Sequence, residues 1–306
     1  MKVIEKDLPI VYQKAIRRHF PKTEIRSIHL NDEGLVNDVV IINDEWVLRF
    51  PKGDTWQRDL LANEIKVLEL VRQHTDIRVP VFEVQTEDLV AYKLIPGQPL
   101  LRNTILSAPE IVQDRLAEQL GVFLYQFHNI SKAELTRANI AQSDTNRDRE
   151  VFLKLYQDVQ EELFPLMLDH SKTWVHQHFK PLLAEADFLS YTPALVNGDL
   201  TPYHILYNSQ TQKISGLIDF GTAGIGDPAV DFCCLIDNFG ESFLWRIGQF
   251  YPKIEQFIDR SRFWAGTLPL QWALTGLRSQ DLSWFTVQLT GARDVMPVGT
   301  IRDQTQ

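Results

Sequence analysis

The segment from residue 194 to residue 231 constrains this chain more than any other stretch. Three short apolar runs within it predict buried strands: 194–196, 205–207 and 214–218. Asp199 follows the first run and Asp219 follows the third, and the polar residues 208–213 are typical of a hairpin turn. A sheet that presents two carboxylates at neighbouring strand ends can hold a metal ion beside a reacting group. Asn, Gly and Asp after a strand often only form a turn, but the addition of His204 favours a chemical site.

The composition is that of an ordinary globular chain. Its 306 residues are 44% hydrophobic and 23% charged, which is enough to build two lobes with cores of their own. No apolar run reaches the ~18–20 residues of a bilayer span, and the first residues lack an apolar signal region. Cys233 and Cys234 are adjacent, so they are expected to be small core residues of a reduced protein. We therefore expect a cytoplasmic protein without a membrane partner.

The net charge of −9 argues against a nucleic-acid partner, whose phosphates attract a basic surface. Most of this negative charge lies in residues 96–306. An acidic larger lobe would attract a cationic small-molecule substrate. A solvated acidic surface that keeps the protein soluble explains the charge equally well.

The first 95 residues predict a small lobe with a five-stranded antiparallel sheet. The strands expected in it are these: 25–30, 36–42, 46–50, 80–85 and 89–94. Helical periodicity covers residues 7–20 and 56–74. The loop between the first two strands contains Gly34, and its backbone N–H groups could cover phosphates. An ordinary hairpin turn is the alternative.

One buried ion pair is predicted inside this lobe. Arg49 lies in an apolar strand, and Glu64 lies within the apolar stripe of the next helix, in line with Leu60 and Leu68. A carboxylate on a core-facing stripe is costly unless it meets a cation, and Arg49 is the obvious partner. The alternative is a solvated Glu64 at the edge of the stripe.

The segment Ile95-Pro-Gly97 is expected to interrupt regular secondary structure, because it contains both Pro and Gly. We therefore predict a domain boundary here, which divides the chain into 1–95 and 96–306. The second part is predicted to be mainly helical. Helical periodicity recurs in these stretches: 109–128, 149–168, 172–188, 229–239, 242–250, 254–265 and 268–276. The expected fold class is therefore α+β, with a small sheet-containing lobe and a larger helical lobe.

The order of these features resembles the protein-kinase-like aminoglycoside and macrolide phosphotransferase family, a group of bacterial antibiotic-resistance kinases. Its 2''-phosphotransferase branch is the most similar. The most specific matching motifs are Gly198-Asp199-Leu-Thr-Pro-Tyr-His204, Ile218-Asp219-Phe-Gly and Gly226-Asp227-Pro-x-x-Asp231. Supporting motifs are Val47-Leu-Arg49-Phe-Pro51, Asn63-Glu64 and Ala91-Tyr-Lys-Leu-Ile-Pro-Gly97.

The resemblance implies a role for each matching residue in the second half of the chain. Asp199 would orient the acceptor hydroxyl and take its proton. Asp219 would hold Mg²⁺, with His204 as second metal ligand. Asp231 would brace the catalytic loop rather than react.

In the first half of the chain, the resemblance implies nucleotide binding. Arg49, held by Glu64, would lie on the phosphates of ATP or GTP. Lys93, Leu94 and Ile95 would form the hinge whose backbone groups meet the purine.

Several positions depart from the pattern of the kinase superfamily. His204 replaces a more usual Asn, and imidazole suits Mg²⁺ less well than an amide oxygen does. Arg49 replaces the more usual Lys, but keeps its charge when buried. No Ala-Pro-Glu segment follows Asp219-Phe-Gly, so no protein partner or protein substrate is implied.

The acceptor would bind near the C-terminal helices, where three residues are candidate contacts: Asp237, Glu241 and Trp272. Asp259, Trp264 and Trp284 are further possibilities, and core packing is the alternative for each Trp. This region is only modestly acidic, which leaves room for a macrolide, a sugar-like metabolite or an amino-alcohol.

The resulting hypothesis is a small-molecule kinase that transfers the γ-phosphate of ATP or GTP to a hydroxyl of an aminoglycoside-type antibiotic. Mg²⁺ is the expected cofactor. A macrolide or metabolite kinase is the alternative within the same family. A nucleotide-binding pseudokinase that acts as an interaction module is an alternative of another class, against which the intact Asp199 and Asp219 argue.

Overall fold

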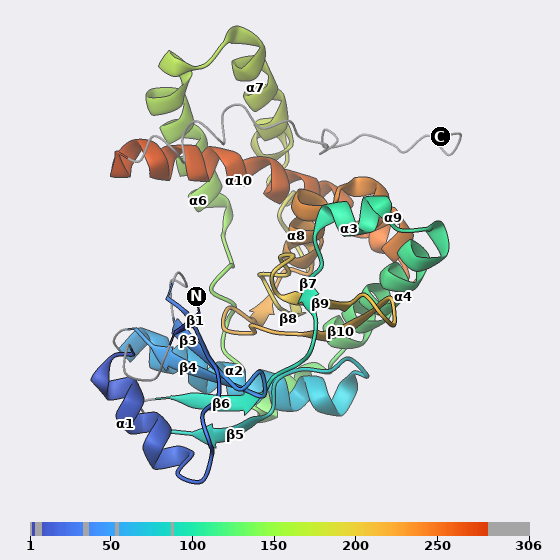
Figure 1. Cartoon of the computed structure of the whole chain (residues 1–306). Helices are drawn as coiled ribbons and strands as arrows, with labels where there is room; N and C mark the ends of the chain where they lie inside the picture. Colours follow the sequence, from blue (N-terminus) through green and yellow to red (C-terminus); the bar gives the residue numbers. More distant parts are fainter. Residues whose placement is uncertain (1, 4–7, 33–36, 53–54, 87–88, 281–306) are drawn as a thin grey trace. The chain divides into compact units, whose positions relative to one another are not determined.

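The computed structural model describes residues 2–3, 8–32, 37–52, 55–86 and 89–280 (Figure 1). For residues 2–3 and 55–59 only the backbone is described. Two compact units are present. The first comprises the described residues up to Pro99 together with His204–Thr222, and the second comprises Leu100–Tyr203 and the described residues from Ala223 onward. The contacts thus group a hairpin from the second half of the chain with the first unit. The functional division at residue 95 stays a prediction.

The first unit is built on a six-stranded antiparallel sheet with the order β1-β2-β3-β4-β6-β5. Its strands are β1 (Lys2–Val3), β2 (Ile28–Asn31), β3 (Asn37–Ile42), β4 (Trp46–Pro51), β5 (Phe82–Gln85) and β6 (Val90–Lys93). The five predicted strands and the antiparallel pairing are confirmed, and the two-residue β1 extends the sheet beyond β2. The turn between β3 and β4 contains Asn43 and Asp44 at positive φ, a conformation that Asn and Asp tolerate better than most residues.

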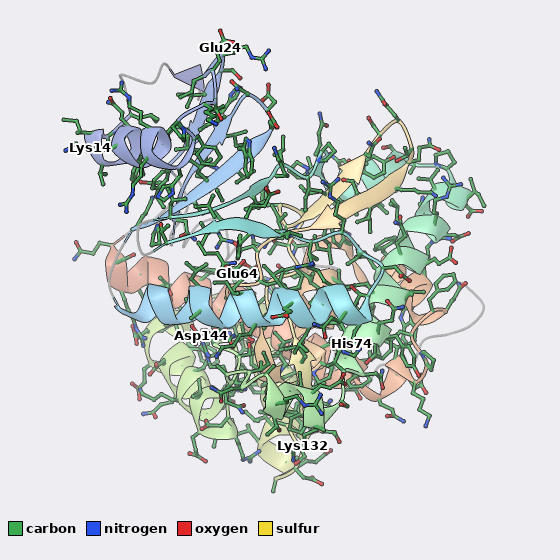
Figure 2. All side chains as sticks on the ribbon, turned by 90° about the horizontal axis from the view of Figure 1, so that it is seen from below. Lys14, Glu24, Glu64, His74, Lys132 and Asp144 are labelled. Atoms are coloured by element: carbon green, nitrogen blue, oxygen red, sulfur yellow. The ribbon has the colours of Figure 1, made fainter. Side chains whose placement is uncertain are left out.

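Two helices complete this lobe: α1 (Ile10–His19) and α2 (Thr55–His74). Ile16 of α1 belongs to the same buried cluster as Val40, Ile42 and Leu48 of the sheet. Along α2, Val67, Leu68 and Val71 are buried with helical spacing, as the periodicity predicts. Figure 2 shows Glu64 on the side of α2 that faces the strands.

The hairpin that joins the first unit consists of β9 (Ile205–Asn208) and β10 (Lys213–Leu217), with β7 (Gln98–Pro99) on the other side of β9. The Leu217 amide donates to the Arg78 carbonyl at 2.8 Å. A Cβ on Gly216 would lie 2.7 Å from that same carbonyl oxygen, so only glycine allows this close approach. The hairpin is thereby held against the segment that leads into β5.

The second unit is mainly helical, as predicted. Its helices are α3 (Arg102–Ser107), α4 (Glu110–His128), α5 (Lys132–Arg137), α6 (Arg149–Asp158), α7 (Asp169–Ala184), α8 (Ala229–Phe239), α9 (Glu241–Gly248) and α10 (Ile258–Ser279). Short 3₁₀ turns lie at η3 (Phe164–Leu166) and η4 (Ile254–Gln256). A two-stranded sheet pairs β8 (Ala194–Val196) with β11 (Gly224–Gly226). None of the described helices combines the length and the apolar character that a membrane-spanning helix requires.

Two of the observed helices differ in their bounds from the helices that the periodicity of the sequence predicts. The predicted helix 149–168 is regular only to Asp158 and then continues as a π-helical turn, η2 (Val159–Leu163). The two helices predicted at 254–265 and 268–276 form the single helix α10, which runs through Pro269. Burial on several sides of α10 stabilises it despite the missing Pro269 N–H.

A buried histidine joins α7 to α10. His178 stacks on Phe263 with 5.3 Å between ring centroids, and its Nε2 lies 2.9 Å from the Phe263 carbonyl oxygen. A Cβ on Gly266 would lie within 2.2 Å of this imidazole, so the glycine makes room for it. Burial lowers the pKa of His178 from 6.5 to about 4.

We predict that the free energy of unfolding depends on the protonation of His178. The unfolded chain takes up this proton as the pH falls through 6.5, whereas the folded chain does so only near pH 4. This residue's contribution is therefore fully present above pH 6.5, and about 3 kcal/mol is lost as the pH falls to about 4.

Urea unfolding of the wild type and of His178→Phe at pH 7, 6, 5 and 4 measures this effect. The stability of the wild type is expected to fall more steeply with acidity than that of the variant. Parallel pH dependences of the two proteins would contradict the prediction.

Candidate active site

Arg49 and Glu64 form the buried ion pair that the sequence predicts. Arg49 Nη1 donates to Glu64 Oε1 at 2.7 Å, and the two residues are 8% and 0% exposed. Burial alone would lower the pKa of the Arg49 guanidinium, but the carboxylates of Glu64 and Asp219 raise it above its ordinary value. Arg49 therefore stays charged at neutral pH. Its contact with a nucleotide remains a prediction.

Glu64 also holds the segment that contains Asp219. The Phe220 amide donates to Glu64 Oε1 at 3.3 Å, and the Gly221 amide donates to Asp219 Oδ1 at 3.2 Å. Asp219 itself has a φ of 61°, a left-handed conformation that a tight turn requires. The sequence predicted the pair of Arg49 and Glu64, but not this third connection.

The β9–β10 hairpin brings the two predicted metal ligands together. His204 directly precedes β9, and its carbonyl accepts a hydrogen bond from the Ile218 amide, next to Asp219. His204 Nε2 lies 3.6 Å from Asp219 Oδ2. The Asp219 side chain is 45% exposed, so a ligand can reach it.

The donor set here fits a Mg²⁺ ion that is shared with a nucleotide. Carboxylate oxygen is the ligand that Mg²⁺ prefers, and Asp219 supplies it at an accessible position. Glu64 Oε2 is a buried carboxylate oxygen that has no hydrogen-bond partner among the described residues. In the described ranges, no group of three or more His, Cys, Asp or Glu side chains could hold a metal alone. Phosphate and water would therefore have to supply the remaining ligands, as is usual for Mg²⁺.

In the predicted hinge, some backbone groups already form hydrogen bonds within the sheet. The Leu94 amide donates to the Glu45 carbonyl at 2.8 Å, which uses it within the sheet. Backbone groups alternate in an extended strand, so those of Lys93 and Ile95 point to the opposite side. Lys93 Nζ pairs with Glu45 at 2.6 Å. Lys93 and Ile95 are therefore better candidates than Leu94 for a backbone contact with a purine.

Tyr92 lies beside this region and was not predicted from the sequence. It is buried on β6, opposite Val47 of β4. Burial raises the pKa of its hydroxyl to about 12, against the opposing effect of Arg49. Gly34, the remaining nucleotide-binding candidate, lies outside the described residues.

In the second unit, Asp231 organises the loop that carries Asp199. The Asn197 amide donates to Asp231 Oδ2 at 2.9 Å, and the Gly198 amide donates to Asp231 Oδ1 at 2.7 Å. The Asp199 amide in turn donates to Asn197 Oδ1 at 2.9 Å. Gly198 has a φ of 80°, which favours glycine at this position. These contacts fit the role of a loop brace that the resemblance implies for Asp231.

Two further residues support Asp231, and neither was predicted from the sequence. His128 Nε2 lies 3.0 Å from Asp231 Oδ2, and His128 Nδ1 lies 3.0 Å from the Tyr251 hydroxyl. Burial raises the pKa of Tyr251 above its ordinary value. The only sequence signal for His128 is its place next to Phe127 at the end of an apolar helix face.

The predicted acceptor contacts differ in their surroundings. Glu241 is buried, and Arg262 Nη2 donates to its Oε1 at 2.5 Å, so it does not present an open carboxylate. Asp237 is half-buried on α8, and Trp272 is 39% exposed on α10. Trp264 is a core residue, as its alternative interpretation expected. Trp284 lies outside the described residues.

Comparisons with known proteins place these features in a family context. The model of the "Phosphotransferase enzyme family" matches residues 27–261. Viomycin phosphotransferase from Streptomyces vinaceus is 30% identical over 203 residues, which cover 65% of this chain and 67% of that protein.

Solved structures support the same grouping. The GDP complex of wild-type aminoglycoside 2'-phosphotransferase-IIIa has a TM-score of 0.78 and 27% identity, with 91% of this chain and 95% of that chain covered. The GDP and kanamycin complex of APH(2")-IIia has a TM-score of 0.79 and 26% identity, with 92% and 96% covered. Macrolide 2'-phosphotransferase type I shares the fold, with a TM-score of 0.68 and 21% identity over 96% of this chain and 100% of that one.

We predict that Asp231→Asn weakens the fold of the second unit. An amide has one acceptor oxygen, so the Asn197 or the Gly198 amide loses its partner, and a buried N–H without a partner costs about 1–3 kcal/mol. Urea unfolding measures this loss, with Asp187→Asn at an exposed position as the matched control. Equal stability of the two variants would remove Asp231 as the brace of this loop.

Proposed function

Because the chain belongs to the phosphotransferase enzyme family, which phosphorylates hydroxyl acceptors, we propose that it transfers the γ-phosphate of ATP or GTP to a small molecule. The observation that carries this proposal is the loop that Asp231 holds through two backbone amides, with Asp199 at its end. A loop fixed in this way suits a carboxylate that must be aimed at one hydroxyl. Asp199 is thus the proposed catalytic base.

In the proposed reaction, the acceptor oxygen forms a bond to the γ-phosphorus while the bond from this phosphorus to the β–γ bridging oxygen breaks. The hydroxyl proton passes to the Asp199 carboxylate. Arg49, kept charged by Glu64, neutralises phosphate oxygens. Asp219 and His204 would hold Mg²⁺, which when bound neutralises charge on the transferred phosphate.

An aminoglycoside-type antibiotic is the first acceptor to test. The structural similarity to a kanamycin-bound relative supports this choice. The similarity to viomycin phosphotransferase gives a second antibiotic class, and macrolides and amino-alcohols complete the panel. GTP is tested beside ATP, since two similar structures with more than 25% sequence identity are complexes with GDP.

Transfer of radiolabelled γ-phosphate to kanamycin, gentamicin, viomycin, erythromycin and small amino-alcohols tests the proposal. ATP and GTP are supplied in turn with Mg²⁺, and omission of Mg²⁺ serves as the control. We expect Mg²⁺-dependent labelling of at least one hydroxyl compound. Nucleotide binding without transfer to any of them would favour the interaction-module alternative.

We predict that Asp199→Asn lowers turnover by about 10²–10⁴-fold, because the amide cannot accept the proton of the acceptor hydroxyl. Nucleotide binding, measured by calorimetry, is expected to be unchanged. Asp187→Asn is the matched control at an exposed position outside the loop. Full activity of the Asp199 variant would remove this residue as the base.

A further inference from the structure

A chain of buried hydrogen bonds supports the loop that carries Asp199. His128 Nε2 lies 3.0 Å from Asp231 Oδ2, and His128 Nδ1 lies 3.0 Å from the Tyr251 hydroxyl. The side chains of His128 and Asp231 are 2% and 0% exposed, and Tyr251 is also buried. Bulk water therefore cannot replace any of these hydrogen-bond partners.

The hydrogens in this chain follow from the chemistry of its groups. A carboxylate only accepts hydrogen bonds, so His128 Nε2 carries the hydrogen that points to Asp231. Burial raises the pKa of Tyr251 above its ordinary value, so its hydroxyl keeps its hydrogen at neutral pH. In the neutral imidazole, this hydroxyl donates to Nδ1. Tyr251 thereby selects the tautomer of His128 whose Nε2 donates to Asp231.

Close packing holds His128 and Tyr251 in this orientation. Both rings pack edge-on against Phe232 of α8, with 5.7 and 4.9 Å between ring centroids. Gly121 lies two turns before His128 on the same face of α4. A Cβ on Gly121 would lie 2.7 Å from the Ile247 carbonyl oxygen, so glycine lets α4 approach the end of α9, shortly before Tyr251.

The donor from His128 fixes the plane of the Asp231 carboxylate. The amides of Asn197 and Gly198 donate to its two oxygens, and His128 donates to Oδ2. The terminal torsion of an aspartate is soft, so the two amides alone would let the carboxylate turn together with the loop. The third donor comes from the end of α4 and ties the carboxylate to a separate element. Loss of this donor would therefore shift both amides, and Asp199 follows Gly198 directly.

A small shift of the loop is enough to affect the proposed reaction. The Asp199 amide donates to Asn197 Oδ1 at 2.9 Å, so a displacement of Asn197 is passed on to Asp199. A displacement of about 1 Å between reacting groups can lower a rate by about 10²-fold. The rate is thus sensitive to groups that lie behind the loop and do not touch the substrate.

We infer that His128 and Tyr251 are positioning residues for phosphoryl transfer: Tyr251 orients the hydrogen of His128, and His128, through Asp231, aims Asp199 at the acceptor hydroxyl. This inference rests on the proposed function. Both residues act through the catalytic loop of the second unit, so they determine kcat and leave the KM for the nucleotide unchanged.

Two substitutions of His128 separate hydrogen bonding from packing. Gln keeps an N–H group near the position of Nε2 but not the ring, whereas Phe keeps a ring but not the donor. With the panel compound that the wild type labels fastest, we expect His128→Phe to lower kcat by about 10–100-fold and His128→Gln to stay within about threefold of the wild type. A kcat of the Phe variant equal to or above that of the Gln variant would assign His128 to packing alone and overturn the inference.

Tyr251→Phe is a milder variant, which removes one hydroxyl and keeps the ring. Either tautomer of His128 can then form, and only one of them donates to Asp231, so we expect kcat to fall about three- to tenfold. Added to His128→Phe, the same change is expected to lower kcat by less than about twofold, because Tyr251 acts only through His128. An unchanged kcat of Tyr251→Phe would overturn its role, and this variant decides the inference if His128→Phe does not fold.

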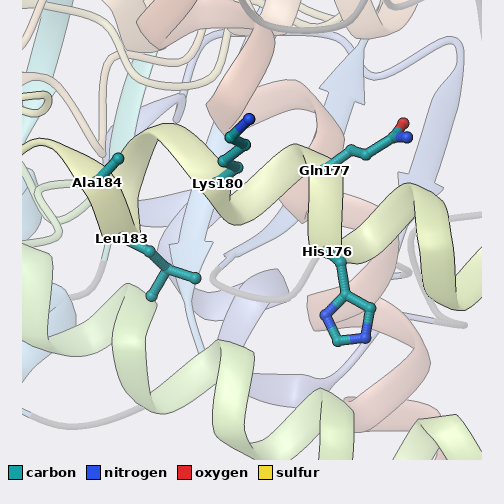
Figure 3. Close-up of a pocket in the computed structure, with 5 residues that line it drawn as sticks. All are labelled: His176, Gln177, Lys180, Leu183 and Ala184. Carbon is teal, nitrogen blue, oxygen red and sulfur yellow. The ribbon is translucent and has the colours of Figure 1, made fainter.

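A second His–Tyr pair provides the matched control. His176 Nδ1 lies 2.6 Å from the Tyr156 hydroxyl, and Figure 3 shows His176 among the residues that line an open hollow along α7. His176→Phe and His176→Gln make the same two exchanges at an exposed position, and we expect kcat to stay within about twofold of the wild type. Circular dichroism establishes that each variant is folded in the assay. A loss of kcat in His176→Phe as large as that in His128→Phe would overturn the inference.

Hydrogen exchange tests the positioning without any acceptor. NMR measures the exchange of the Asn197 and Gly198 amides in the wild type, in His128→Phe and in His176→Phe. We expect exchange at least about tenfold faster in the His128 variant only, with the amide of the buried Phe179 of α7 as internal reference. Faster exchange of the loop alone supports the inference even if no panel compound is phosphorylated, in which case only the proposed function fails. Equal acceleration of the loop and Phe179, or no acceleration, would overturn the inference even if transfer occurs.

Discussion

The candidate active site of the second unit depends on the hydrogen bonds that the buried Asp231 carboxylate accepts from two backbone amides. A carboxylate removed from water is costly unless hydrogen bonds compensate it, and this one receives two backbone N–H groups and lies beside His128. Those amides belong to Asn197 and Gly198, so the loop adopts one geometry when the carboxylate is satisfied. Because the buried carboxylate must keep these hydrogen bonds, the loop and with it Asp199 are held in one position.

In the first unit, the buried Glu64 carboxylate holds a backbone segment in the same way. Its buried carboxylate binds the Arg49 guanidinium and also accepts from the Phe220 amide, next to Asp219. In both units, a buried acid holds the backbone beside a more accessible aspartate. The accessible aspartate is then available for chemistry, because the buried acid and not the aspartate holds the turn in place.

Local patterns in the sequence were sufficient to predict much of this arrangement. The strands that precede Asp199 and Asp219 follow from short apolar runs, and the pair of Arg49 and Glu64 follows from a charge on an apolar stripe. His128 and Tyr251 could not be found in this way, since their contacts join residues more than a hundred positions apart. The π-turn after Asp158 and the continuation of α10 through Pro269 likewise depend on tertiary packing, which overrides local preference.

The pairing of Glu241 with Arg262 shows why composition is a poor guide to the charge of a site. The chain has a net charge of −9, and the C-terminal helices contain several acids that suggest a cationic ligand. Arginines of α10 nevertheless pair with three of these acids: Asp227, Glu241 and Asp259. Asp259 is close to its arginine in the sequence, whereas Asp227 and Glu241 are far from theirs. The charge that a ligand meets is what remains after these internal pairs have formed.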